Sequence, residues 1–257
     1  MKPHERIIVA LDVATPNEAI GLVRELRDHV GCFKIGLQFI TAMLKSIIVP
    51  VTWEATSNLT DIRILFAELQ DNIFWDGKFN DIPNTVAGAV VEVNNIRVKM
   101  FNVHVSSGAK AIAEASKVKG DSLLLGVTVL TSLCDDDCHG IFGDSSVTKV
   151  LQFAKMVMDN GGDGIVCSAL ELKNIRWHQG RYKIFEKLPL AVIPGIRPEW
   201  ASVGDQKRVM TPGEAVKAGA DYLVIGRPII KPPAKIGGPV EAAKLIAAEI
   251  EKALKEV

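Results

Sequence analysis

The sequence predicts a single closed (β/α)8 barrel (a TIM barrel), and three observations lead to this fold class. Eight short apolar runs are spread over the 257 residues. The runs are continuous rather than alternating, which is typical of parallel strands buried on both faces. Helical patterns separate them, and eight βα units in about 250 residues match one barrel. The expected strands are residues 7–12, 32–38, 72–78, 99–105, 122–130, 164–168, 190–194 and 222–226.

The connections between these runs have helical patterns. The first helix opens at Thr15, where Glu18 stands at the capping-box spacing. The second connection, residues 41–71, divides into two helical parts. The last helix, residues 239–256, carries an apolar stripe. No linker or change of composition interrupts the pattern, so we expect one domain over residues 1–257.

Composition excludes several classes of function. The chain is 48% hydrophobic with a formal net charge of zero. It has no block rich in lysine and arginine, which argues against a dedicated nucleic-acid binder. It shows no signal peptide and no run of about 18 apolar residues, so we expect a soluble cytoplasmic protein without membrane contact.

The four cysteines divide into two groups. Cys32 and Cys167 lie in apolar runs, as buried small hydrophobic residues do. Cys134, Cys138 and His139 form a cluster that could ligate a metal, but the C-x3-C-H spacing departs from the usual paired cysteines. We interpret this cluster as a polar loop and expect no metal site.

The most informative stretch, residues 76–81, places two carboxylates and an ammonium group within six residues. Asp76 and Lys78 are two apart on the third expected strand, so their side chains share a face. Asp81 falls just beyond the strand end, in the loop before Pro83. Barrel enzymes keep their chemistry at the C-terminal ends of strands. A lysine between two carboxylates is a positive charge and a proton donor held at a fixed point, so this stretch predicts a catalytic site.

Two further charged residues extend this group. Asp12 ends the first expected strand. Lys34 lies inside the second, where a lysine among apolar residues is uncommon without a partner. In a closed barrel both would face inward near the C-terminal mouth, beside Asp76 and Lys78. The four side chains would form a network of alternating charge.

Other loops predict an anion site and a polar contact. The candidate anion ligands follow the seventh and eighth strands, where barrels bind phosphate: Arg197, Gln206, Gly226 and Arg227. Glycine lets backbone N–H groups approach a ligand, and arginine donates bidentate hydrogen bonds. Thr131 and Ser132, after the fifth strand, carry hydroxyls suited to an uncharged ring edge, although loop capping explains them equally well.

These motifs together resemble the orotidine 5′-phosphate decarboxylase family over nearly the whole chain. The matching segments are ALD (10–12), FKIGLQ (33–38), DGKFNDIPNTV (76–86), VTVLTSL (127–133), PGIRP (194–198), GDQKRVMTP (204–212) and IGRPI (225–229). The resemblance implies a homodimeric barrel with shared active sites. It also implies a nucleotide monophosphate substrate, orotidine 5′-monophosphate, which is converted to UMP without metal or organic cofactor.

The resemblance also implies a role for each matching position. Lys78 would donate the proton to C6, and Asp76 would lie beside the substrate carboxylate. Asp12 and Lys34 would hold the ribose hydroxyls and complete the charge network. Asp81 and Thr85 would reach into the partner subunit's active site. Thr131 or Ser132 would contact the pyrimidine. The substrate and its phosphate would be bound by Arg197, Gln206, Gly226 and Arg227.

Two alternatives remain open. A sugar-phosphate decarboxylase or aldolase of the same suprafamily (3-keto-gulonate 6-phosphate decarboxylase or hexulose phosphate synthase) also carries D-x-K-x-x-D, but requires magnesium. The IPNT and GDQKR segments favour the nucleotide enzyme. A non-catalytic nucleotide-binding barrel would not need the intact set of charged residues around Lys78.

Overall fold

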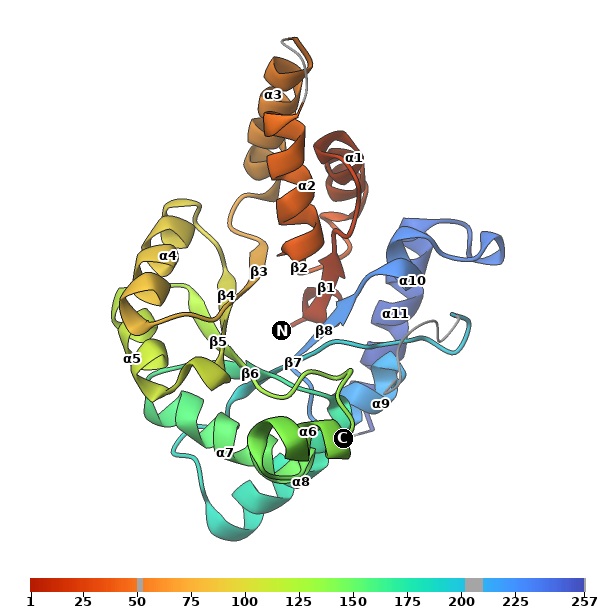
Figure 1. Ribbon diagram of the computed structural model, residues 1–257. Coiled ribbons are helices and arrows are strands. Elements are labelled where there is room, and N and C mark those ends of the chain that lie inside the picture. Colours follow the sequence, from red (N-terminus) through yellow and green to blue (C-terminus); the bar gives the residue numbers. More distant parts are fainter. Residues whose placement is uncertain (50–52, 202–209, 257) are drawn as a thin grey trace.

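Eight parallel strands close into a barrel in sequence order, as predicted (Figure 1). The structure is a computed structural model, and it describes residues 1–49, 53–201 and 210–256. The strands are β1 (Ile7–Ala10), β2 (Cys32–Gly36), β3 (Ile73–Phe79), β4 (Met100–His104), β5 (Leu123–Val127), β6 (Gly164–Val166), β7 (Leu190–Ile193) and β8 (Tyr222–Ile225). Most expected strands ran further than the observed ones, because the loops at the mouth of the barrel continue the apolar patterns.

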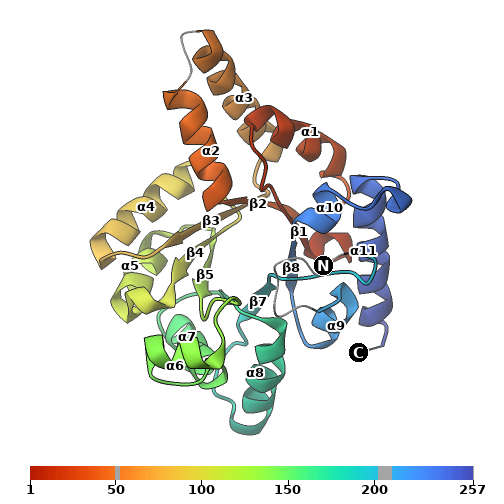
Figure 2. The same cartoon turned by 45° about the vertical axis from the view of Figure 1, so that its right-hand side comes forward.

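Helices surround the barrel on its outside (Figures 1 and 2). They are α1 (Pro16–Leu26), α2 (Leu37–Ile48), α3 (Trp53–Leu69), α4 (Pro83–Asn95), α5 (Ala109–Val118), α6 (Asp135–Phe142), α7 (Ser146–Asp159), α8 (Ala169–Tyr182), α9 (Pro212–Lys217), α10 (Arg227–Ile230) and α11 (Pro239–Leu254). The described residues also form the short 3-10 helices η1 (His4–Arg6), η2 (Val105–Ser107) and η3 (Ala234–Ile236). The expected two-part connection is the pair α2 and α3, which projects from the ring in both views.

Apolar side chains form two layers. The larger layer lies between the strands and the helices, and includes Phe39, Phe101 and Ile246, all fully buried. The smaller layer fills the interior of the barrel: Ile8, Ala10, Cys32, Phe74, Met100, Leu125, Val192, Tyr222 and Val224. The inward-facing layer is a packed core, so a ligand can enter only above it, at the C-terminal ends of the strands.

The segment around Cys134 corrects one expectation. The predicted polar loop is the short helix α6, which begins after Cys134 and has Cys138 on its buried face. Asp137 accepts a hydrogen bond from the Cys134 backbone N–H at 3.1 Å, so the acidic run caps this helix. Within the described residues, no group of three or more His, Cys, Asp or Glu side chains is arranged to hold a metal ion. Nor does that part of the chain contain a helix long and apolar enough to cross a bilayer.

Candidate active site

A cavity of about 650 Å³ opens at the C-terminal mouth of the barrel. Ala10, Phe74 and Val224, which belong to the interior apolar layer, form part of its wall. This volume is typical of a small-molecule site. The predicted site residues that line the cavity are Asp12, Lys34, Asp76, Lys78, Thr131, Arg197, Gly226 and Arg227. The barrel therefore brings together most of the residues singled out from the sequence.

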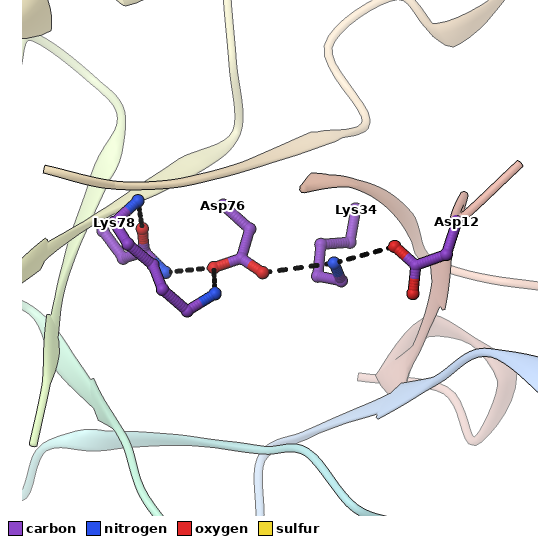
Figure 3. A network of polar contacts seen from close by, with 5 residues as sticks. Asp12, Lys34, Asp76 and Lys78 are labelled. Atoms are coloured by element: carbon purple, nitrogen blue, oxygen red, sulfur yellow. Dashed lines mark hydrogen bonds and ion pairs between the residues drawn. The ribbon is translucent and has the colours of Figure 1, made fainter. Parts of the chain in front are cut away.

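Four side chains form a row of alternating charge along β1, β2 and β3 (Figure 3). Asp12 Oδ1 lies 3.4 Å from Lys34 Nζ, which lies 3.1 Å from Asp76 Oδ2. Asp76 Oδ1 in turn accepts a hydrogen bond from Lys78 Nζ at 2.7 Å. Each carboxylate of the row contacts an ammonium group, and Asp76 contacts two.

Asp76 is the carboxylate that joins the two lysines of the row. The Asp76 side chain is 10% exposed and that of Lys34 is 12% exposed. Burial alone would raise the pKa of Asp76, but the ammonium groups of Lys34 and Lys78 and hydrogen bonds from Lys78 and Asn102 outweigh it. The pKa of Asp76 therefore lies below its ordinary value. The carboxylate stays ionised at neutral pH and holds both ammonium groups in place.

Gly36, the last residue of β2, makes room for this arrangement. A methyl group built at Gly36 would collide with Lys34 Nζ and would lie 3.6 Å from Asp76 Oδ2 and 3.7 Å from Asp12 Oδ1. It would therefore occupy the place of the ammonium group between the two carboxylates. The backbone of Gly36 (φ −102°, ψ 175°) is open to any residue, so space alone calls for glycine at this position.

Strand β3 bulges where it carries Asp76 and Lys78. Trp75 pairs with Phe101 and Phe79 pairs with Val103, so three residues of β3 face one residue of β4. Lys78 has φ 48°, which is uncommon for a residue other than glycine. The prediction that Asp76 and Lys78 meet is confirmed, but they meet through this bulge rather than through a regular strand.

Asn102 and His104 on β4 were missed by the sequence reasoning. Asn102 is fully buried; its Nδ2 donates to Asp76 Oδ1 at 2.6 Å and its Oδ1 accepts from the Lys78 backbone N–H at 2.8 Å. Burial, followed by the nearby Lys78 charge, lowers the pKa of His104. Their signal was available: two polar residues spaced two apart in an apolar strand share one face.

The segments that follow β7 and β8 contribute three cationic side chains to the described lining of the cavity. Arg197 follows β7, and Arg227 follows β8 at the start of α10. Lys231, which the sequence reasoning missed, lines the same cavity. A methyl group at Gly226 would meet Ala10 and Asp12 at 3.5 and 3.8 Å, which are ordinary contacts. These cations suit an anion, whereas the row on β1 to β3 has balanced charge.

The hydroxyl groups that follow β5 have different environments. Thr131 lines the cavity, whereas Ser132 is exposed and lies outside the described lining. Thr128 is 2% exposed and donates its hydroxyl proton to the Val166 carbonyl oxygen at 2.9 Å, so it ties β5 to β6. The geometry therefore favours Thr131 over Ser132 as a ligand contact.

Besides Ser132, two predicted residues that the structure describes, Asp81 and Thr85, do not line the cavity. Asp81 is exposed, and its carboxylate accepts a hydrogen bond from the backbone N–H of Ile82, the residue before α4, at 2.6 Å. Thr85 is exposed in the first turn of α4. Neither lines the cavity of its own chain. Gln206 lies outside the described residues.

The chain is similar to orotidine 5′-phosphate decarboxylases over nearly its whole length. The model of the orotidine 5′-phosphate decarboxylase / HUMPS family matches residues 5–246. The orotidine 5′-phosphate decarboxylase of Syntrophomonas wolfei is 37% identical, over 98% of this chain and 100% of its own. That of Trichlorobacter lovleyi is 38% identical over 95% of each chain. The crystal structure of orotidine 5′-phosphate decarboxylase from Lactobacillus acidophilus has a TM-score of 0.70 at 29% identity, covering 95% of this chain and 98% of that one.

Proposed function

The chain belongs to the orotidine 5′-phosphate decarboxylase / HUMPS family, and from this premise we propose how its cavity decarboxylates orotidine 5′-monophosphate to UMP in pyrimidine biosynthesis. The observation that supports the residue assignments is that the row Asp12, Lys34, Asp76 and Lys78 shares one cavity with the cations that follow β7 and β8. The reaction needs a fixed positive charge and a proton donor beside the reacting carbon, and the row supplies both.

Lys78 is the proton donor in this proposal. As the bond between C6 and the carboxylate carbon breaks, CO₂ leaves and the electron pair remains on C6. The ammonium group of Lys78 stabilises this developing negative charge and then transfers a proton to C6, leaving a neutral amine. Asp76, beside the leaving carboxylate, holds the ammonium group at 2.7 Å before the reaction. Each tenfold gain in rate corresponds to about 1.4 kcal/mol of transition-state stabilisation.

The rest of the nucleotide is held along the cavity. Asp12 and Lys34 bind the ribose hydroxyls, and Thr131 contacts the pyrimidine. Arg227 binds the phosphate, together with Arg197, Gln206 and the backbone at Gly226. Binding energy from the phosphate, far from the reacting bond, can support loop closure and exclusion of water, so these contacts act on turnover as well as on affinity.

Asp81 and Thr85 act in the neighbouring subunit of a homodimer. Asp81 is exposed just before α4 and Thr85 is exposed in its first turn, and neither lines the cavity of its own chain. In this arrangement each site takes Lys78 from one chain and Asp81 from the other. We place this dimer, one barrel domain in each chain, in the cytoplasm.

A direct assay tests the activity and separates it from the sugar-phosphate alternative. Purified protein, treated exhaustively with a chelator, should decrease the absorbance of orotidine 5′-monophosphate and yield UMP. Lys78→Ala should lose several orders of magnitude in kcat, because charge stabilisation and proton donation vanish together, while UMP binding persists. Activity that disappears with the chelator and returns with magnesium would favour the sugar-phosphate reaction. A Lys78→Ala variant within tenfold of the parent would refute the assignment of the acid.

A further inference from the structure

A buried amide contacts both Asp76 and Lys78, the two charged residues on β3. Asn102, in the middle of β4, is fully buried, and its side chain contacts both Asp76 and Lys78. A buried amide needs partners for its donors and its acceptor, and here both partners belong to the charge row. The direction of the amide is fixed by chemistry, because only Oδ1 can accept the Lys78 N–H and only Nδ2 can donate to a carboxylate.

The backbone of β3 depends on this side chain. The bulge places Asp76, Gly77 and Lys78 opposite Asn102 alone. Lys78 therefore takes its hydrogen-bond acceptor from a side chain, Asn102 Oδ1 at 2.8 Å. This contact accompanies the uncommon φ of 48° at Lys78. Backbone in this region persists only when its surroundings hold it, and Asn102 supplies such a contact.

The same amide also orients the carboxylate that the lysine contacts. Asp76 Oδ1 accepts from Asn102 Nδ2 at 2.6 Å and from Lys78 Nζ at 2.7 Å. Asn102 therefore holds Lys78 in two ways. It accepts a hydrogen bond from the Lys78 backbone N–H, and it fixes Asp76 Oδ1, the oxygen atom that the Lys78 ammonium group contacts. A change at Asn102 would release both contacts together.

We propose that Asn102 is a positioning residue for the reaction: it aims the Lys78 ammonium group at C6 by fixing the β3 bulge and the Asp76 carboxylate. The inference rests on the proposed function, in which Lys78 is the proton donor. Position 102 needs an amide rather than another group of the same size, because one atom must accept from the Lys78 N–H and the other must donate to Asp76. An ionised carboxyl group in its place would accept from Lys78 but would repel Asp76.

Two substitutions and one control separate positioning from general stability. Asn102→Asp keeps the shape and the acceptor but loses the donor at high pH, and Asn102→Ala loses both. Asn94→Ala is the matched control, because Asn94 in α4 also donates to a part-buried carbonyl oxygen, that of Val118 in α5, but does not line the cavity. Each protein is assayed for kcat, KM and melting temperature with orotidine 5′-monophosphate.

We expect both Asn102 variants to lose about a hundredfold in kcat at pH 8, since a misplacement of about 1 Å has this effect on an oriented reaction. KM should stay within about threefold, because the cavity residues that bind the nucleotide are intact. The kcat of Asn102→Asp should then rise as the pH falls from about 8 to about 5.5, unlike that of the parent. Protonation gives the new carboxyl group an O–H donor toward Asp76 and leaves its carbonyl oxygen to accept from Lys78.

The outcomes are distinguishable. Asn102 variants within about threefold of the parent kcat, or an equal loss in Asn94→Ala, would overturn the inference, and so would a pH profile of Asn102→Asp that follows the parent. If a variant does not fold, hydrogen exchange on the parent decides: the Lys78 backbone N–H should exchange slowly, and rapid exchange overturns the inference. A parent inactive toward orotidine 5′-monophosphate would refute the proposed function instead, and the exchange measurement would still test the Asn102 contact.

Discussion

Gly36→Ala removes space from the charge row without removing any of its charges. The added methyl group would collide with Lys34 Nζ, between Asp12 and Asp76. Ordinary carbon contacts begin at about 3.5 Å, so the ammonium group must withdraw by about 1 Å. The backbone at Gly36 accepts alanine, and the colliding atom is the end of a flexible side chain. We therefore expect a folded protein with a displaced Lys34.

The separation of Lys34 Nζ and Asp76 Oδ2 sets the size of the effect. At 3.1 Å, with an effective dielectric constant of about 20, their attraction is about 5.4 kcal/mol. At about 4.1 Å it falls to about 4.0 kcal/mol. The difference, about 1.3 kcal/mol, corresponds to roughly a tenfold loss in kcat/KM if the row acts in the transition state. Folding stability should change little, because alanine restricts the unfolded chain and gains about 0.5 kcal/mol.

Initial rates with orotidine 5′-monophosphate, together with urea unfolding, measure the two effects separately. Gly21→Ala is the control: Gly21 lies in α1, and a methyl group there meets no atom within 4 Å. We expect the control to keep the parental kcat/KM and Gly36→Ala to lose about tenfold at nearly unchanged stability. The reasoning fails if Gly36→Ala retains parental activity, or if its activity falls only in step with a large loss of stability.

Three further predictions concern the other parts of the site. Arg227→Ala should raise KM at least tenfold, and orotidine without its phosphate should be a very poor substrate of the parent; equal rates with both compounds would remove the phosphate assignment. Lys78→Ala and Asp81→Ala, each inactive alone, should regain about a quarter of parental activity after unfolding and refolding together, because statistical mixing gives some dimers one intact site. If no activity is recovered despite confirmed subunit exchange, Asp81 acts in the active site of its own chain. The pKa of His104 lies below its ordinary value, so the unfolded chain binds this proton first and the free energy of unfolding falls as the pH drops below about 6.5. His104→Gln should flatten that fall in urea titrations, and an unchanged slope would contradict it.

The barrel could be predicted because its strands are short, continuous apolar runs. All eight observed strands fall at the expected positions, with β3 one residue longer at its end. The helix α6 was missed because its first turn, Asp135 to Asp137, reads as a polar loop. Acidic side chains are in fact favourable at a helix N-terminus, where they face unsatisfied N–H groups.

The charge row could be predicted because Asp12, Lys34, Asp76 and Lys78 are all charges at the C-terminal ends of successive strands. Their inward direction follows from strand geometry, and the cavity confirms it. Asn102 could not be weighted in the same way. Its importance comes from the β3 bulge, a shift in register that the apolar pattern of β3 does not encode.

The charged residues of the cavity come from the two halves of the barrel, and this has a consequence for its stability. Asp12, Lys34, Asp76 and Lys78 belong to the half-barrel formed by β1 to β4, whereas Arg197 and Arg227 belong to the half formed by β5 to β8. The two halves meet along two seams, where β4 pairs with β5 and β8 pairs with β1. In the proposed binding mode, a nucleotide contacts both halves and joins them across the two seams. Because a ligand that binds only the folded barrel adds to its stability, occupancy of this site should raise the free energy of unfolding.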